Sequence, residues 1–176
     1  MAQAPAPAPS PAPAPAPAPA PDEAAFRTLY RQLVEINTTR SVGSCTAAAE
    51  AMRARLLAAG IPASDTQILA PPDRPKDGAL IAVLHGRDRT AKPILLLAHI
   101  DVVEAKREDW ERDPFKLVEE KGWFYARGAS DDKAMAAVFT DSLIRSGRKV
   151  SSRAATSSWR SPAARRRRKS STASGG

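Results

Sequence analysis

The chain has 176 residues, 43% of them hydrophobic and 26% charged, a length that allows one domain of ordinary size. Its formal net charge is +8, but Ser146–Gly176 holds nine Lys or Arg and no acidic residue. The remainder therefore has 18 basic against 19 acidic residues, a formal charge of −1, which excludes a globally basic surface for nucleic acid. One Cys excludes an internal disulfide framework, and no apolar run approaches the roughly 20 residues of a membrane helix.

Residues 1–21 are almost wholly Ala-Pro alternation and hold nine of the sixteen prolines. This composition predicts a disordered linker of the polyproline-II type, extended at about 3.1 Å per residue. No charged n-region and apolar h-region precede it, so the chain as written is expected in the cytoplasm. A signal peptide lost upstream would instead make the protein periplasmic or secreted.

Three helices are predicted in residues 22–145, the part that can fold. From Asp22 to Ile36 apolar residues recur at helical spacing, with acidic residues at the N-terminal end. A second helix runs from Cys45 to Ala59 and stops at Gly60, and a third begins near Asp131 and continues to Ile144.

Strand-like runs lie between the second and third helices, at Gln67–Leu69, Ala79–Leu84 and Ile94–Ala98. The last is apolar throughout, which predicts a central strand buried on both faces. Phe115–Val118 and Trp123–Ala126 flank a turn and predict a hairpin. Helices mixed with strands indicate an α/β layer architecture.

His99 and Asp101 follow the predicted central strand, at the strand end where such sheets place ligands. Two residues apart on an extended chain, they point to the same side. An imidazole can bind zinc through one nitrogen while the other donates to a carboxylate. On residue types alone, however, a His-x-Asp pair is more often incidental.

A second polar segment, Ala126–Lys133, places small residues before the adjacent acids Asp131 and Asp132 at the start of the third helix. Acidic residues there can cap the helix. The alternative interpretation is that the Asp131 carboxylate bridges two divalent cations.

Taken together, the order and spacing of the two motifs indicate a protein family far more specifically than either motif does alone. They resemble the co-catalytic zinc family of aminoacylases and metallopeptidases, which includes acetylornithine deacetylase, succinyl-diaminopimelate desuccinylase, glutamate carboxypeptidase and carnosine-type dipeptidases. The resemblance implies the N-terminal part of a zinc-exopeptidase-type α/β catalytic domain, with helices around a mixed central sheet. The residues that carry it are Leu95–Val103, Trp110, Asp113–Phe115 and Gly122–Lys133.

What the resemblance implies for the site is a pair of divalent metal ions, zinc by preference, with cobalt and manganese as alternatives. His99 would bind one metal ion, Asp101 would orient His99 as a catalytic positioning group, and Asp131 would bridge both ions. Asp132 and Lys133 would be motif neighbours and not ligands. The intact relative would cleave an amide beside a free carboxylate in a small acyl-amino acid or peptide, and a homodimer is expected only with the family's lid domain. Glu104, Ala126 and Ala134 depart from the family pattern.

The remaining catalytic groups of that family, a Glu base, two acidic ligands and a distant His, follow the Asp131 motif. After Asp132 this sequence has one acidic residue, Asp141, and no His, so the chain is predicted to be inactive by itself. Glu119 and Glu120 precede Asp131 in the predicted hairpin, where neighbouring side chains point oppositely, and are read as a solvated edge. His85 is interpreted as a structural or surface residue, and Cys45 as an inert packing residue.

Residues 146–176 are predicted to be a basic, disordered tail. One choice of permitted codons for the tail, read in the neighbouring frame, gives a basic loop, a strand and a Glu-Glu pair. We therefore hypothesise that the tail is a frameshift product. The alternative is a non-enzymatic binding protein that uses the run Arg165–Lys169 as a nucleic-acid or nuclear-localisation arm. No specific nucleic-acid partner is expected.

Overall fold

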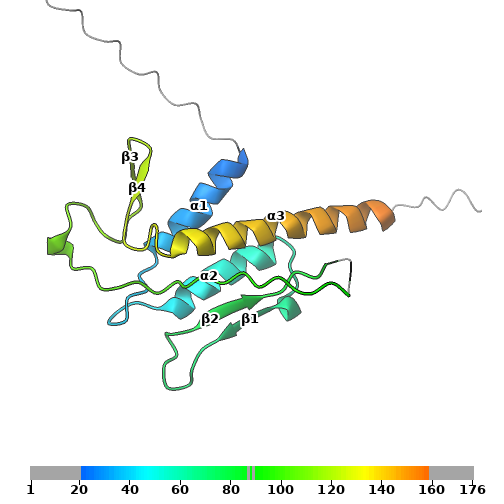
Figure 1. The fold of residues 1–176 in the computed structure, drawn as a ribbon, viewed down its shortest axis with the longest axis horizontal. Coiled ribbons are helices and arrows are strands. Elements are labelled where there is room, and N and C mark those ends of the chain that lie inside the picture. The colour runs from blue at the N-terminus through cyan, green and yellow to red at the C-terminus, as the bar shows by residue number, and fades with distance from the viewer. Residues whose placement is uncertain (1–20, 87, 89, 159–176) are drawn as a thin grey trace, which may run out of the picture.

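The computed structural model describes residues 21–86, 88 and 90–158 (Figure 1). Residues 1–20 of the predicted linker and the arginine run after Ser158 lie outside these residues, whereas Pro21, the last residue of that linker, is the first residue of α1. The elements in chain order are α1 (Pro21–Glu35), α2 (Cys45–Ala58), η1 (Ala63–Asp65), β1 (Thr66–Leu69), β2 (Ala79–Ala82), η2 (Arg107–Asp109), β3 (Val118–Glu120), β4 (Trp123–Tyr125) and α3 (Lys133–Ser158). The predicted α/β class is confirmed.

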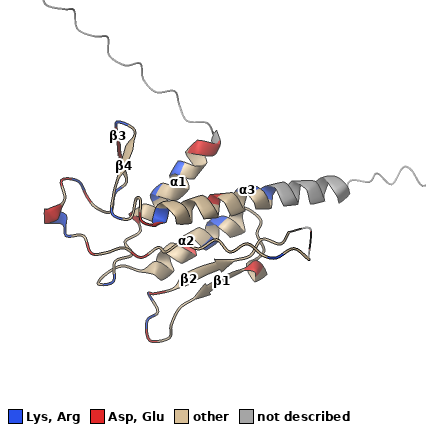
Figure 2. Cartoon of the chain, viewed as in Figure 1, with Lys and Arg blue, Asp and Glu red and all other residues tan. Residues whose placement is uncertain are grey.

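The three predicted helices are present, and local sequence signals explain two of their ends. Ser44 caps α2, because its Oγ accepts a hydrogen bond from the Ala47 backbone N–H at 3.1 Å. Just beyond the C-terminal end of α2, Gly60 adopts a φ of +89°, a conformation in which helices often terminate. Basic and acidic residues are interspersed along the elements in the view of Figure 2.

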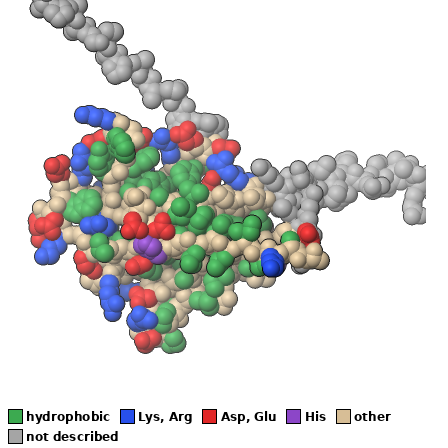
Figure 3. Space-filling view, in the orientation of Figure 1, with side chains coloured by type: hydrophobic (Ala, Val, Ile, Leu, Met, Phe, Trp, Pro, Cys, Tyr) green, Lys and Arg blue, Asp and Glu red, His purple; other side chains and the backbone are tan. Residues whose placement is uncertain are grey.

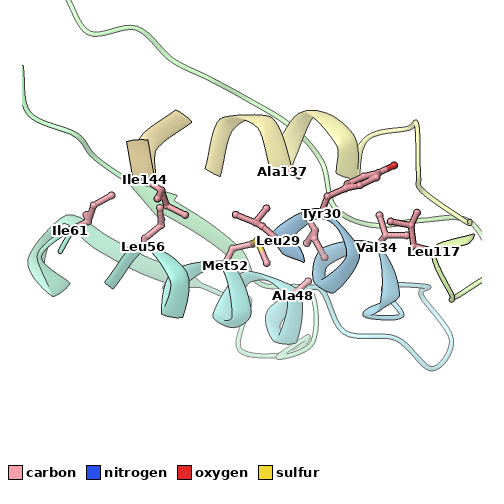
Figure 4. Packing of buried hydrophobic residues seen from close by; sticks show 11 residues of the cluster. Leu29, Tyr30, Val34, Ala48, Met52, Leu56, Ile61, Leu117, Ala137 and Ile144 are labelled. Carbon is pink, nitrogen blue, oxygen red and sulfur yellow. The ribbon is translucent and has the colours of Figure 1, made fainter. Parts of the chain in front are cut away.

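The core lies where the three helices meet (Figure 4). Leu33 from α1 and Leu56 from α2 are fully buried, and Ala137 of α3 packs against the same cluster. Full burial of each leucine contributes roughly 1.5–3 kcal/mol of transfer free energy. The other members of the cluster are Leu29, Tyr30, Val34, Ala48, Met52, Ile61, Leu117 and Ile144.

Two antiparallel strand pairs complete the fold. β1 pairs with β2 from Thr66↔Ala82 to Leu69↔Ala79, and this pair packs on α2. A hairpin is present as predicted, with β4 inside the predicted second strand, but its first strand, β3, begins at Val118, where the predicted strand ended. The strands are joined through Lys121 and Gly122, which both have positive φ, as a type I′ hairpin turn requires. The acidic pair of the hairpin faces solvent in ion pairs, Glu119 with Arg27 and Glu120 with Arg112.

The prediction that Ile94–Ala98 is a buried central strand is wrong. This segment has no assigned secondary structure, and its four large apolar side chains are 47–87% exposed. A strand buried on both faces needs neighbours on both edges and layers above and below it. The described residues form only two two-stranded sheets, and neither includes this segment, so the mixed central sheet is not formed there.

The third helix is longer than predicted. It continues from Lys133 to Ser158 and so extends into the segment for which disorder was predicted from residue 146. Within the described residues, no helix is long and apolar enough to cross a membrane.

Candidate functional site

His99, Asp101 and Asp131, the three residues singled out by sequence, lie together. The His99 Nε2 atom is 3.0 Å from Asp131 Oδ1, although 32 positions separate the two residues. On the other side of the ring, Nδ1 is 3.3 Å from Asp101 Oδ1 and also 3.3 Å from the Asp101 carbonyl oxygen. Each nitrogen of the imidazole therefore faces its own carboxylate.

Two backbone segments bring these side chains together. His99 and Asp101 follow the unpaired run Ile94–Ala98, whereas Asp131 stands two residues before α3. The segments approach closely at Gly128, where a Cβ atom would lie 2.6 Å from Val102 Cγ1. Gly128 also has a φ of +77°, which glycine adopts without strain. Tyr30 of α1 fixes the same turn by donating a hydrogen bond to the Ala129 carbonyl oxygen.

The two carboxylates favour a protonated His99. Partial burial lowers the pKa of His99, but it is outweighed by the hydrogen bond with Asp131, the hydrogen bond with the Asp101 backbone and both carboxylate charges. The net pKa lies above its usual value of 6.5. In the protonated ring, the Nε2–H group points at the Asp131 carboxylate.

The site opens to solvent through a cavity of about 250 Å³. The side chains of Asp101 and Asp131 are 73% and 89% exposed, which leaves both carboxylates accessible. Figure 3 shows a histidine bordered by acidic side chains in the middle of one face. Besides the three site residues, the cavity is lined by Val102, Val103, Ala126, Arg127, Gly128, Ala129 and Ser130.

The donor chemistry fits a zinc-type ion, although the donor count is low. An imidazole nitrogen and a carboxylate are ordinary ligands for zinc, and a carboxylate behind the second ring nitrogen is the usual orienting group. In the part of the chain that the structure describes, no group of three or more His, Cys, Asp or Glu is arranged to hold a metal ion. The described residues thus supply two candidate ligands, His99 and Asp131, with Asp101 behind His99.

Lys133, read from sequence as a mere motif neighbour, is a fully buried structural residue. Its Nζ donates to the carbonyl oxygens of Ile36 at 2.7 Å and Val34 at 3.4 Å, where α1 ends. Burial lowers the pKa of Lys133 to about 8. A lysine at the first position of α3 is unfavourable for the helix dipole, and this signal in the sequence indicates that the side chain has a partner elsewhere.

The other two candidates lie outside this arrangement. His85 Nε2 is 3.5 Å from Asp65 Oδ1, in the segment after β2. Cys45 begins α2, and burial raises the pKa of its thiol above the usual value. That shift keeps the thiol protonated, which agrees with the interpretation of Cys45 as an unreactive packing residue.

Comparison with known proteins shows a family likeness for the segment that carries these residues. The sequence model of peptidase family M20/M25/M40 matches residues 95–151, a range that contains all three site residues. The N-fatty-acyl-amino acid synthase/hydrolase of Mus musculus is 48% identical over 50 residues, 28% of this chain and 10% of the relative. Aminoacylase-1 of Pongo abelii is 31% identical over 121 residues, 67% of this chain and 28% of the relative.

A third relative, the Cys-Gly metallodipeptidase of Schizosaccharomyces pombe, is 47% identical over 51 residues, 28% of this chain and 11% of that protein. The chain belongs to peptidase family M20/M25/M40. The matched regions span between 10% and 28% of the length of these three relatives.

Proposed function

We propose that this chain is part of a metal-dependent amidohydrolase or peptidase and carries the first half of its metal centre. His99 would bind one metal ion through Nε2, and the Asp131 carboxylate would bind that ion and bridge to a second. The observation that carries this proposal is the placement of His99 between two carboxylates, one on each ring nitrogen. The family match over residues 95–151 supports it.

Asp101 has a separate role in this proposal. By accepting the Nδ1 proton, its carboxylate fixes the tautomer in which the lone pair of Nε2 points toward Asp131. When bound, zinc or a similar ion polarises the scissile carbonyl and activates a water molecule. The chain's own contribution is to hold the imidazole and the bridging carboxylate at a fixed separation in an open cavity.

We infer the substrate class from the names of the relatives. The Mus musculus protein is named for N-fatty-acyl-amino acids and the Schizosaccharomyces pombe protein for Cys-Gly. Both compounds contain an amide bond next to a free carboxylate. A small acyl-amino acid or dipeptide is therefore the substrate that we propose for the complete catalytic unit.

The 176 residues alone are proposed to bind metal weakly and to leave the amide uncleaved. After Asp132 the sequence has one acidic residue, Asp141, and its carboxylate is held by Arg145 at 2.6 Å. A general base next to the metal centre is therefore not supplied by this part of the chain. Measurable turnover of N-acetyl-amino acids or dipeptides by purified chain with added zinc would contradict this.

Calorimetric titration with Zn²⁺ tests the metal centre, and the chain provides its own matched control. His85 and His99 are the two histidines, and both side chains are 52% exposed. We expect His99→Ala and Asp131→Asn to abolish binding, whereas His85→Ala should leave it unchanged. Equal losses in His85→Ala and His99→Ala would reject the proposed site.

A further inference from the structure

The segment that carries His99 and Asp101 is held from its C-terminal side. Before His99, the run Ile94–Ala98 makes no backbone hydrogen bond to another described residue, and its leucines are exposed. Contacts after His99 therefore fix where the imidazole and the Asp101 carboxylate lie. The hydrogen bonds among those contacts come from the α1–α2 loop, residues 36–44.

Thr38 makes the central contacts. Its Oγ donates to the Ile100 carbonyl oxygen at 2.6 Å, and its own carbonyl oxygen accepts from the Val102 N–H at 3.3 Å. These two hydrogen bonds bracket Asp101, and the first acts on the residue between His99 and Asp101. Thr38 is 1% exposed, so water does not compete for them.

The α1–α2 loop is itself internally braced. The Asn37 side-chain oxygen accepts from both N–H and Oγ of Thr39, and the Ser44 N–H donates to the Asn37 carbonyl oxygen. Gly43 lies so close to Thr39 that a Cβ there would be 2.3 Å from the Thr39 nitrogen. Because the loop is constrained in this way, it can hold the segment that it contacts in a fixed position.

The same loop is also tied to the segment that carries Asp131. Lys133, two residues after Asp131, donates to the Ile36 carbonyl oxygen, two residues before Thr38. The contacts thus connect Asp131 to His99 through Lys133, Ile36, Thr38 and Ile100. This path is in addition to the direct contact between His99 and Asp131.

We propose that Thr38 is a positioning residue for the metal centre, acting through the backbone on both sides of Asp101. The inference deepens the proposed function, since it concerns the same site. Glu104 extends this attachment: its carboxylate accepts from the Ser41 N–H at 3.0 Å and the Ser41 Oγ at 2.8 Å. The departure from the family pattern at Glu104 therefore serves to tie this segment to the α1–α2 loop.

Thr38→Val tests the proposal because it removes the hydroxyl with little change in shape. Thr140→Val is the matched control: Thr140 is also buried, and its Oγ also donates to a carbonyl oxygen, that of Ala136 in α3. We expect Thr38→Val to weaken Zn²⁺ binding about tenfold, as loss of an orienting contact does, while Thr38→Ser and Thr140→Val bind like the wild type. If Thr38→Val and Thr140→Val behave alike, the proposal is overturned.

A metal-free measurement separates this proposal from the proposed function. The imidazole NMR resonances of His99 should move in Thr38→Val and stay in place in Thr140→Val, whether or not the wild type binds zinc. Unmoved His99 resonances in Thr38→Val would overturn the proposal even if zinc binds. Should Thr38→Val fail to fold, Ser41→Ala takes its place: Ser41 is exposed, and loss of its bond to Glu104 should shift His99 more than Thr140→Val does.

Discussion

The buried ammonium group of Lys133 lies 2.7 Å from the carbonyl oxygen of Ile36, at the point where α1 gives way to the α1–α2 loop. The contact joins the first residue of α3 to the end of α1, 97 positions earlier in the chain. Carbonyl groups at the end of a helix have no partner within it, and a lysine side chain can satisfy them. Lys133 therefore links the helix that follows Asp131 to the loop that holds His99 and Asp101.

Lys133 should make the free energy of unfolding rise with pH above neutrality. Its pKa is about 8 in the folded chain against 10.5 for an ordinary lysine, so between these values the unfolded chain binds more protons. Stability should therefore increase as pH rises from 8 to 10.5, by about 3 kcal/mol at most. Urea unfolding at a series of pH values measures this increase.

Lys133→Met provides the comparison for that experiment. Tyr30 and Cys45 have raised pKa values, so their contribution to the free energy of unfolding falls as pH rises. Both residues are present in the wild type and in Lys133→Met. The difference between wild type and Lys133→Met isolates the lysine. If the free energy of unfolding depends on pH in the same way in both proteins, the pKa of Lys133 is not lowered in the folded chain.

Gly128→Ala should destabilise the fold more than Gly122→Ala. Both glycines have positive φ, +77° and +81°, so alanine costs roughly 1–2 kcal/mol of backbone strain at either position. At Gly128 the new Cβ also meets Val102 Cγ1 at 2.6 Å, whereas at Gly122 nothing lies within 4 Å. The extra crowding should make the loss of unfolding free energy about 1–3 kcal/mol larger for Gly128→Ala, as measured by urea unfolding. Equal losses in the two variants would contradict the close approach of Gly128 to Val102.

The exposed run Ile94–Ala98 should make the chain self-associate, because apolar side chains and unpaired backbone groups are presented together. Leu95, 83% exposed, can be replaced by Glu with a change in unfolding free energy within about 0.5 kcal/mol. Light scattering over a range of concentrations should show less association for Leu95→Glu. Val42→Glu, at an exposed apolar residue outside this run, should leave association unchanged. An equal reduction of association in Val42→Glu would show that Ile94–Ala98 is not the segment responsible.

Asp131→Asn should lower the pKa of His99 more than Asp101→Asn does. The hydrogen bond with the Asp131 side chain is the largest influence that raises this pKa, whereas part of the Asp101 influence comes from its carbonyl oxygen, which the substitution keeps. Because the pKa is raised on folding, the stability that protonated His99 contributes is present below pH 6.5 and is lost as pH rises through the folded-state value. NMR titration of the imidazole in the metal-free variants measures both shifts, and a larger effect of Asp101→Asn would contradict the observed geometry.

Local sequence signals sufficed for α1, α2 and the presence of the β3–β4 hairpin, because helical spacing, the stop at Gly60 and the turn at Lys121 and Gly122 act within a few residues. The same reasoning failed at Ile94–Ala98. An apolar run indicates burial, yet the burial of a strand depends on partners distant in sequence, and the described residues supply none.

The meeting of His99, Asp101 and Asp131 was predictable from two motifs in a known order. The contacts that hold these three residues in place could not be predicted in the same way. The contacts of Thr38 with Ile100 and of Lys133 with Ile36 span 62 and 97 positions, and neither residue belongs to a pattern that specifies its partner. Such contacts follow from how α1, α3 and the loop between α1 and α2 pack, which only the folded chain shows.

Binding of a metal ion by His99 can be tested through the imidazole nitrogen NMR spectrum during addition of Zn²⁺. We expect the Nε2 resonance of His99 to shift until zinc saturates the chain, while Nδ1 keeps its hydrogen bond to Asp101. We expect the resonances of His85 to stay in place. A zinc response confined to His85, equal at both histidines, or absent from both would contradict the proposal that His99 is a metal ligand.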